Sequence, residues 1–336
     1  MSFIFIFYIG GESMEIKGID ISEWQGNLSL DDFKKIKEAG IEFVIIRCGY
    51  TTYGKSKLKY VDDYFENNYK LCKQVGLPVG TYYYSCATTI EESTSEAEFV
   101  LKLIKNKQFE YPIVIDTEDN HDIKNSNYAN TSQASIAKTK LTPIISNFCN
   151  ILEKNNYYVS IYASTYWFRN RLILDDLVSY DKWIAQWSES VNFEEKYGIW
   201  QYSSTGRVNG ISGNVDLDYS YKDYPKIMKD MGLNGFVKEV PEIKEYTLTI
   251  NYLYEDGSMA SPSLVKQIVE GTNYSYTSPG IIGYTPDRTV ISGIMDKDET
   301  YDVIYTKEEP IKQLSFWKKI ITFFKGIFSF LKNLFK

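Results

Sequence analysis

Short apolar runs alternate with amphipathic segments along residues 16–234. The runs are rich in Val, Ile and aromatic residues and are bounded by polar, Gly or Pro positions, a pattern that indicates buried strands. Eight strands are predicted in this way, over residues 17–21, 43–47, 79–85, 112–116, 159–163, 183–186, 198–202 and 215–217.

Amphipathic helices are predicted between several of these strands. Phe65, Tyr69 and Cys72 recur at i, i+4 and i+7, the spacing that puts apolar side chains on one helical face. Gly40 and Gly76 stand where the C-caps of the first two helices would fall. The helices are predicted over residues 30–39, 62–75, 91–104 and 132–154.

The alternation of strand and helix predicts βα units and a mainly parallel sheet. Eight strands within about 220 residues favour a closed barrel with helices on its outside. Some of the later connections are too short for a full helix. We therefore expect an α/β fold, an irregular (β/α)8-type barrel.

The pattern changes after the barrel. Residues 246–254 (YTLTINYLY) alternate with a period of two and precede an EDGS turn, which predicts a hairpin. Further strands are predicted over residues 265–269, 281–284 and 301–305, so that this part is a small, mainly antiparallel β domain. The expected organisation is a leader outside the fold (1–13), the barrel (14–234), a linker (235–245), the β domain (246–307) and a basic amphipathic helix (315–336).

The two ends of the chain differ in character. The apolar run at residues 3–9 has no basic residues before it and no A-x-A site after it, so we expect no ordinary secretion signal and accumulation in the cytoplasm. From Ile311 onward the chain has six lysines and no acid. Residues 315–336 predict a basic amphipathic helix that lies on an anionic membrane surface. The alternative is a helix docked on its own protein or on a partner.

Composition excludes several classes of function. The net charge of −7 disfavours a nucleic-acid binder, which needs a basic surface. His121 is the single histidine, so a zinc site with two histidine ligands cannot be formed. The four cysteines show no C-x-x-C spacing and lie within or beside apolar runs, which predicts buried free thiols.

Acidic residues follow three of the predicted strands. The strand 112–116 ends in Asp116-x-Glu118, and residues i and i+2 of a strand point to the same side. Asp20 ends the first strand and Asp216 ends the last, and these two strands are neighbours in a closed barrel. Catalytic side chains of such barrels gather at the carboxyl ends of the strands. Converging carboxylates are the apparatus of glycoside hydrolysis, although exposed acids at a strand end are the plainer explanation.

Several ordered segments together resemble glycoside hydrolase family 25, the muramidases that cleave bacterial peptidoglycan. They are GIDISEWQG at 18–26, GTYYY at 80–84, IDTE at the end of the strand 112–116, IYAS, WIAQW, WQYS and GISGNVDLD at 210–218. The resemblance covers roughly residues 15–225 and implies cleavage of the β-1,4 bond between N-acetylmuramic acid and N-acetylglucosamine, with no cofactor. The lack of an ordinary secretion signal and the basic amphipathic tail favour a phage or prophage endolysin that meets peptidoglycan after the membrane fails.

The resemblance implies roles for individual acids. Glu118 corresponds to the general acid, and Asp116 to the residue that orients the substrate's 2-acetamido group or stabilises the charged intermediate. Asp20 and Asp216 correspond to the other two active-site carboxylates, although Asp218 would share the face of Asp216. A D-x-E pair acting on an N-acetylated sugar favours a substrate-assisted retaining mechanism.

The resemblance also implies a sugar-binding groove. Positions expected to line it are Tyr82, Tyr84, Tyr162, Trp187 and Gln201, for which ordinary barrel packing is the alternative. Many family members carry K-x-[ST]-E-G after the second strand, whereas this chain has RCGY at 47–50. We expect Arg47 to replace the charge of that lysine.

Three other functions compete with a hydrolase. Residues 49–56 satisfy the phosphate-loop pattern G-x-x-x-x-G-K-[ST], but the next predicted helix starts too late for a phosphate site. Asp116, Glu118, Asp119, His121 and Asp122 could form a metal site, although the segment is better explained as a polar loop. The third alternative is a non-catalytic wall-binding protein with the same barrel.

The β domain has a looser resemblance of its own. The segments YLYEDG at 252–257, IIGY at 281–284 and DVIYTK at 302–307 resemble the MucBP-like repeats of bacterial surface proteins. The resemblance implies binding to wall or surface glycan, and a plain spacer is the alternative.

Overall fold

The computed structural model describes residues 14–119, 131–238, 243–309 and 320–327. They divide into two compact units, with the boundary between Glu239 and Val240. The predicted leader 1–13, part of the linker 235–245 and most of the tail 315–336 lie outside the described residues. Each unit is described by itself.

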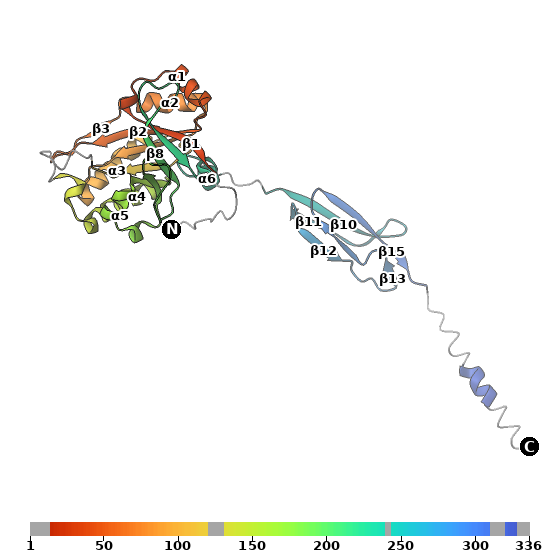
Figure 1. The fold of residues 1–336 in the computed structure, drawn as a ribbon. Coiled ribbons are helices and arrows are strands. Elements are labelled where there is room, and N and C mark those ends of the chain that lie inside the picture. The colour runs from red at the N-terminus through yellow and green to blue at the C-terminus, as the bar shows by residue number, and fades with distance from the viewer. Residues whose placement is uncertain (1–13, 120–130, 239–242, 310–319, 328–336) are drawn as a thin grey trace, which may run out of the picture. The chain divides into compact units, whose positions relative to one another are not determined.

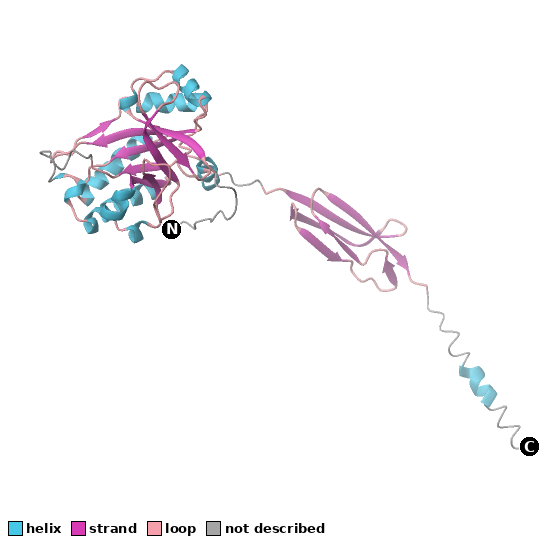
Figure 2. Cartoon of the chain, viewed as in Figure 1, coloured by secondary structure: helices cyan, strands magenta, loops and turns pink. Residues whose placement is uncertain are grey.

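The first unit is a closed barrel of eight strands, which confirms the predicted fold class (Figures 1 and 2). Around the barrel the order is β1-β9-β8-β7-β6-β5-β4-β2, and β2 pairs with β1 to close it. The short strand β3 (Lys59–Val61) extends the sheet beside β2. The barrel strands are β1 (Ile16–Ile21), β2 (Phe43–Thr51), β4 (Val79–Tyr84), β5 (Ile113–Asp116), β6 (Val159–Ser164), β7 (Asp181–Ala185), β8 (Ile199–Gly206) and β9 (Val215–Ser220).

Strand β9 runs against both of its neighbours. It follows β8 directly as a hairpin, because the residues between them are too few for a crossover helix, which a parallel pair would need. The expectation that Asp216 ends its strand is therefore wrong, since Asp216 is the second residue of β9. The reversal nevertheless brings Asp216 beside Asp20, its register partner on β1.

Helices cover the outside of the barrel (Figure 2). They are α1 (Leu30–Glu38), α2 (Phe65–Val75), α3 (Ile90–Ile104), α4 (Lys138–Glu153), α5 (Thr165–Arg171) and α6 (Tyr224–Met231). The predicted start of α2 at Asp62 is three residues early, because the Asp62 carboxylate instead accepts hydrogen bonds from the backbone of Glu23 and Tyr64. The predicted start of α4 is also early, since a separate 3-10 turn, Gln133–Ser135, precedes it. The sequence analysis did not identify α5 and α6.

Successive side chains of a strand point to opposite faces of the sheet, so the barrel strands contribute to two separate cores. On β2, Val44 and Ile46 pack in the core beneath the helices, whereas Phe43 and Ile45 belong to the core inside the barrel. Inside the barrel, the rings of Phe43 and Tyr111 stack with centroids 4.2 Å apart. Gly18 of β1 leaves room for this stack, because a Cβ there would lie 2.2 Å from the Phe43 ring. The inner core is thus apolar at the amino ends of the strands.

The segment with the phosphate-loop pattern forms part of a hairpin. Strand β2 continues to Thr51 and pairs antiparallel with β3, so that residues 52–58 connect two strands. No helix begins at Lys55 or Ser56, and the amide cradle of a phosphate loop is therefore not formed. All four cysteines are buried and free, as predicted.

The second unit contains six strands. They are β10 (Glu245–Tyr254), β11 (Met259–Val269), β12 (Asn273–Thr277), β13 (Tyr284–Pro286), β14 (Val290–Ile294) and β15 (Glu299–Lys307). Most pairs are antiparallel, but β10 and β15 are parallel. The predicted strand 281–284 is wrong: Ile281 and Tyr284 form an isolated bridge, and the strand β13 begins at Tyr284.

Residues 320–327 of the tail are helical. Ile321, Phe323 and Phe324 are exposed there by 53%, 67% and 57%. Among the described residues, no helix is long and apolar enough to cross a membrane.

Candidate active site

Acidic side chains meet at one end of the barrel interior. The alternation that places Val114 inside the barrel places Asp116 there too, and Glu118 follows two residues after the end of β5. Asp20 of β1 and Asp216 of β9 are register partners. The four acids that the sequence predicted as catalytic therefore share one rim, at the carboxyl ends of the parallel strands.

The charges of this rim act on the pair after β5. Burial, followed by the repulsion of Asp216 and Asp119, raises the pKa of Glu118 to about 7. Burial, followed by the charge of Glu118, raises the pKa of Asp116 well above its ordinary value, and the nearby Arg47 opposes that rise. Glu118 can consequently hold a proton near neutral pH, as a proton donor must.

Asp20 and Asp216, on the paired strands β1 and β9, also have raised pKa values. Burial, followed by the charges of Asp216, Asp218 and Asp116, raises the pKa of Asp20 well above its ordinary value. Burial raises the pKa of Asp216 to about 6. The register pairing of Asp20 with Asp216 places these two side chains on the same face of the sheet. Asp116 Oδ1 is buried without a hydrogen-bond partner among the described residues, so this oxygen lacks a donor.

Gln201 of β8 connects the groove aromatics to Asp20. Its Oε1 accepts hydrogen bonds from Tyr162 Oη at 2.9 Å and from Trp187 Nε1 at 3.0 Å. Its Nε2 donates to Asp20 Oδ2 at 2.7 Å. The Trp187 side chain is 64% exposed although its ring nitrogen is tied down, so it presents a fixed apolar face to solvent.

The two predicted tyrosines of β4 are two positions apart and point to the same face of the sheet. The ring of Tyr82 is 6.1 Å from that of Trp183 inside the barrel, and burial, followed by the charge of Asp20, raises the pKa of its hydroxyl. Tyr84 hydrogen-bonds to the hydroxyl of Tyr53 and to the backbone of Glu118. Tyr84 therefore contacts the segment that carries the acids.

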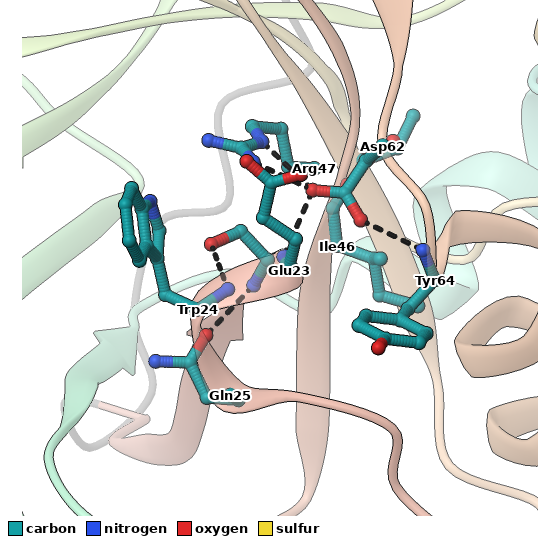
Figure 3. Close-up of polar contacts among 9 residues, drawn as sticks. Glu23, Trp24, Gln25, Ile46, Arg47, Asp62 and Tyr64 are labelled. Atoms are coloured by element: carbon teal, nitrogen blue, oxygen red, sulfur yellow. Dashed lines mark hydrogen bonds and ion pairs between the residues drawn. The ribbon is translucent and has the colours of Figure 1, made fainter.

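Arg47 is engaged by two carboxylates (Figure 3). Its Nε donates to Asp62 Oδ2 at 2.8 Å, and its Nη2 lies 2.8 Å from both Asp62 Oδ2 and Glu23 Oε1. Asp62 Oδ2 also accepts from the Glu23 backbone at 2.9 Å. Arg47 thus holds the 3-10 turn Glu23–Gln25 in place, a contact that the sequence analysis missed because Asp62 was assigned to a helix.

The same turn presents an indole that the sequence analysis did not select. Trp24 is 80% exposed, and Figure 3 shows its ring pointing away from the Arg47 cluster. Ser22 accepts from the Trp24 backbone at 3.3 Å, and Gln25 Nε2 donates to Asn214 O at 3.3 Å, which connects the turn to the segment before β9. In the sequence, Trp24 lies four positions after Asp20, and this closeness to a predicted catalytic acid could have identified it as a candidate.

A buried polar network supports the β4 and β5 strand ends from behind. Glu96 of α3 accepts from Ser85 Oγ at 2.6 Å and from the Cys86 backbone at 3.1 Å. Gln133 accepts from Thr117 Oγ1 at 2.8 Å and donates to Ser85 Oγ at 3.3 Å. Since Thr117 separates Asp116 from Glu118, this network fixes the backbone that carries both acids.

The metal-site alternative finds no support in the part of the chain that the structure describes. No group of three or more His, Cys, Asp or Glu side chains there could hold a metal ion. His121 and Asp122, two members of the proposed set, lie outside the described residues.

Comparison with known proteins relates this geometry to a family. Residues 19–211 match the family model described as glycosyl hydrolases family 25. An autolytic lysozyme of Clostridium acetobutylicum is 32% identical over 206 residues, which cover 60% of this chain and 55% of that protein. Lysozyme M1 of Streptomyces globisporus is 25% identical over 211 residues, which cover 60% of this chain and 66% of that protein. This chain therefore spans about half the length of the first relative.

The fold comparison agrees with the sequence matches. The modular autolysin LytC from Streptococcus pneumoniae has a TM-score of 0.54 and 28% identity, over 63% of this chain and 48% of that one. A second structure of LytC, at the same identity and coverage and a TM-score of 0.53, is a complex with a synthetic peptidoglycan ligand. The family model matches more than half of the chain. The chain belongs to glycosyl hydrolases family 25.

Proposed function

We propose that this protein is a peptidoglycan hydrolase that cleaves the β-1,4 bond between N-acetylmuramic acid and N-acetylglucosamine. The observation that carries the proposal is the convergence of Asp20, Asp116, Glu118 and Asp216 on one barrel rim. The similarity to two lysozymes and to an autolysin solved with a synthetic peptidoglycan ligand supports this substrate class.

Glu118 is the proton donor in this proposal. Its raised pKa of about 7 keeps the carboxyl protonated until the glycosidic oxygen receives the proton. Asp116, two residues earlier, faces the same space with an unpartnered Oδ1. That oxygen accepts the N–H of the substrate's 2-acetamido group and orients the acetamido oxygen toward the anomeric carbon.

The reaction then follows a substrate-assisted retaining route. The acetamido oxygen attacks the anomeric carbon as Glu118 protonates the leaving oxygen, and the same carboxylate later removes a proton from the incoming water. NMR of the first product distinguishes retention from inversion at the anomeric carbon. Retention of the β-anomer supports this mechanism, and the inverted anomer contradicts it.

The aromatic rim supplies the sugar-binding surface. The exposed face of Trp187 is held by its hydrogen bond to Gln201, so that binding a sugar ring costs little side-chain entropy. Tyr82, Tyr84 and Tyr162 border the acids from β4 and β6. Arg47 contributes by holding the neighbouring turn and by its charge near Asp116.

Digestion of purified cell walls by the wild type and by Glu118→Gln tests the proposal. We expect new reducing ends of muramic acid from the wild type alone. Release of free amino groups instead would identify an amidase or peptidase. Wall binding by a wild type that releases neither product would support the non-catalytic alternative.

The other parts of the chain extend the proposal. We propose that the tail 315–336 lies on anionic membranes, supported by the exposed Ile321, Phe323 and Phe324 of residues 320–327. Vesicle sedimentation of the full chain and of a variant without residues 311–336 tests it, and equal binding by the two would refute it. Wall-glycan binding by the β unit, its MucBP-like character and accumulation in the cytoplasm before wall attack stay predictions.

A further inference from the structure

Asp218 is a fifth carboxyl inside the barrel, and the proposed reaction does not use it. It is fully buried on β9, opposite Gly18 of β1. Its Oδ1 accepts a hydrogen bond from Trp183 Nε1 at 2.8 Å. Its Oδ2 has no nitrogen or hydroxyl donor among the described residues, and the side chain that it contacts instead is the carboxyl of Asp20.

The hydrogen bonds of Gln201 show that one oxygen of Asp20 is an acceptor. Gln201 Oε1 accepts from two donors, Tyr162 Oη and Trp187 Nε1, so the other end of this amide, Nε2, must point to Asp20. Since an amide nitrogen only donates, Asp20 Oδ2 acts as an acceptor. Any hydrogen bond between Asp20 and Asp218 therefore needs a proton that one of the two carboxyls carries.

Each of the two carboxyls thus has one oxygen that accepts from a donor, and Asp218 Oδ2 has no second donor among the described residues. Two ionised carboxylates within reach of one another would repel each other without any bond between them. A single proton between them supplies the donor that Asp218 Oδ2 lacks. We propose that Asp20 and Asp218 form an acid pair that shares one proton, with Asp218 acting as the positioning residue for Asp20.

Among the residues that the structure describes, no other group neutralises these two carboxyls. Asp216 approaches from β9, and Asp116 with Glu118 from the end of β5. Tyr82 and Tyr162, from β4 and β6, bring hydroxyl groups. The cation on this rim is Arg47 of β2, and its ion pairs among the described residues are to Asp62 and Glu23.

The shared proton has a consequence for the proposed hydrolysis. The pair carries one negative charge in place of two, which lessens the repulsion that Asp216 and Glu118 experience. It also holds the Asp20 carboxyl in one orientation between Gln201 and Asp218. This consequence rests on the proposed function, whereas the acid pair itself rests on the hydrogen-bond directions.

Substitution at Asp218 tests the pair by activity. In Asp218→Asn, the amide oxygen accepts from Trp183 and the amide nitrogen donates to Asp20, as a protonated Asp218 would. We expect this variant to keep kcat/KM within about threefold of the wild type, whereas Asp218→Ala loses at least about tenfold because Asp20 loses its donor. Asp175→Asn, an exposed change on another face, is the matched control. Equal losses in Asp218→Asn and Asp218→Ala overturn the proposal.

A second measurement does not depend on activity or on the folding of Asp218→Ala. The Trp183 indole N–H resonance, assigned by its loss in Trp183→Phe, reports the charge of Asp218. We expect a titration step above the ordinary carboxyl range in the wild type and none in Asp218→Asn, because the shared proton leaves at a higher pH than that of an isolated carboxyl. A wild-type resonance that does not move above pH 5 overturns the acid pair, even if wall digestion supports the hydrolase.

Discussion

The hydroxyl of Tyr84 donates a hydrogen bond of 3.2 Å to the backbone carbonyl of Glu118. Tyr84 is the last residue of β4, and Glu118 follows the neighbouring strand β5. The contact therefore fixes the backbone of the proposed acid where no ladder hydrogen bond is available. It couples the position of the proposed acid to a residue that we also propose as part of the sugar-binding surface.

Glu118 sets the alkaline limit of activity. Its pKa of about 7 is raised above the ordinary value, so the protonated, active form is lost as the pH rises through about 7. We expect kcat/KM on cell walls to fall with a midpoint near that pH. Glu118→Gln should lose about 100-fold or more, the usual contribution of a general acid. Glu91→Gln, an exposed change on α3, is the control, and a variant at 118 with full activity would contradict the assignment.

Arg47 stabilises the fold through a buried carboxylate. The Asp62 side chain is fully buried and that of Arg47 is 11% exposed, so Arg47→Met leaves an uncompensated charge. We expect a loss of roughly 3–5 kcal/mol in the free energy of unfolding, measured by urea denaturation. Arg169→Met removes the exposed pair with Glu194 and should cost less than about 1 kcal/mol. Equal losses in the two variants would show that Asp62 does not depend on Arg47.

Trp24 contributes to binding rather than to stability. Because its side chain is 80% exposed, Trp24→Ala should change the free energy of unfolding by less than about 0.5 kcal/mol. We expect KM for polymeric wall glycan to rise severalfold while kcat stays near the wild-type value, because the indole offers a stacking face beside the acids. Trp24→Phe should restore most of the affinity. An unchanged KM in the alanine variant would remove Trp24 from the binding surface.

Stability falls from mildly acid to alkaline pH. Burial raises the pKa of Glu96 to about 7 from an ordinary value of 4.5, so the folded state binds this proton more tightly than the unfolded state does. The corresponding stability is present below about pH 4.5 and is lost as the pH rises through about 7. Urea midpoints measured across this range should decline in the wild type and decline less in Glu96→Gln. Parallel curves for the two proteins would contradict this account.

The sequence predicted the barrel well because its strands are buried on both faces. Each strand is a short apolar run, and such runs stand out from the amphipathic helices between them. The acids at positions 20, 116 and 118 could be placed from the same pattern. The direction of β9 could not, because a hairpin and a crossover leave the same apolar run, and Asp216 was placed on the right rim by an incorrect strand direction.

The contacts around the acids were less accessible to prediction. The Trp183–Asp218 hydrogen bond joins residues 35 positions apart, and the Glu96–Ser85–Gln133 network joins a helix, a strand end and a 3-10 turn. Neither leaves a periodic signal, because each depends on the closure of the barrel. The Arg47–Asp62 pair was missed because a helix was predicted to begin at Asp62.

The antiparallel direction of β9 determines at which positions the barrel can accept inserted residues. This strand enters at the acidic rim, where Asn214 is tied to Gln25, and leaves at the opposite end of the barrel, where α6 follows. Residues 207–214 therefore border the acidic rim, whereas residues after Ser220 start from the far end of the barrel. Under the proposed function, loop grafts at 207–214 would alter which glycans are admitted, whereas changes to the residues just after Ser220 would leave the rim as it is.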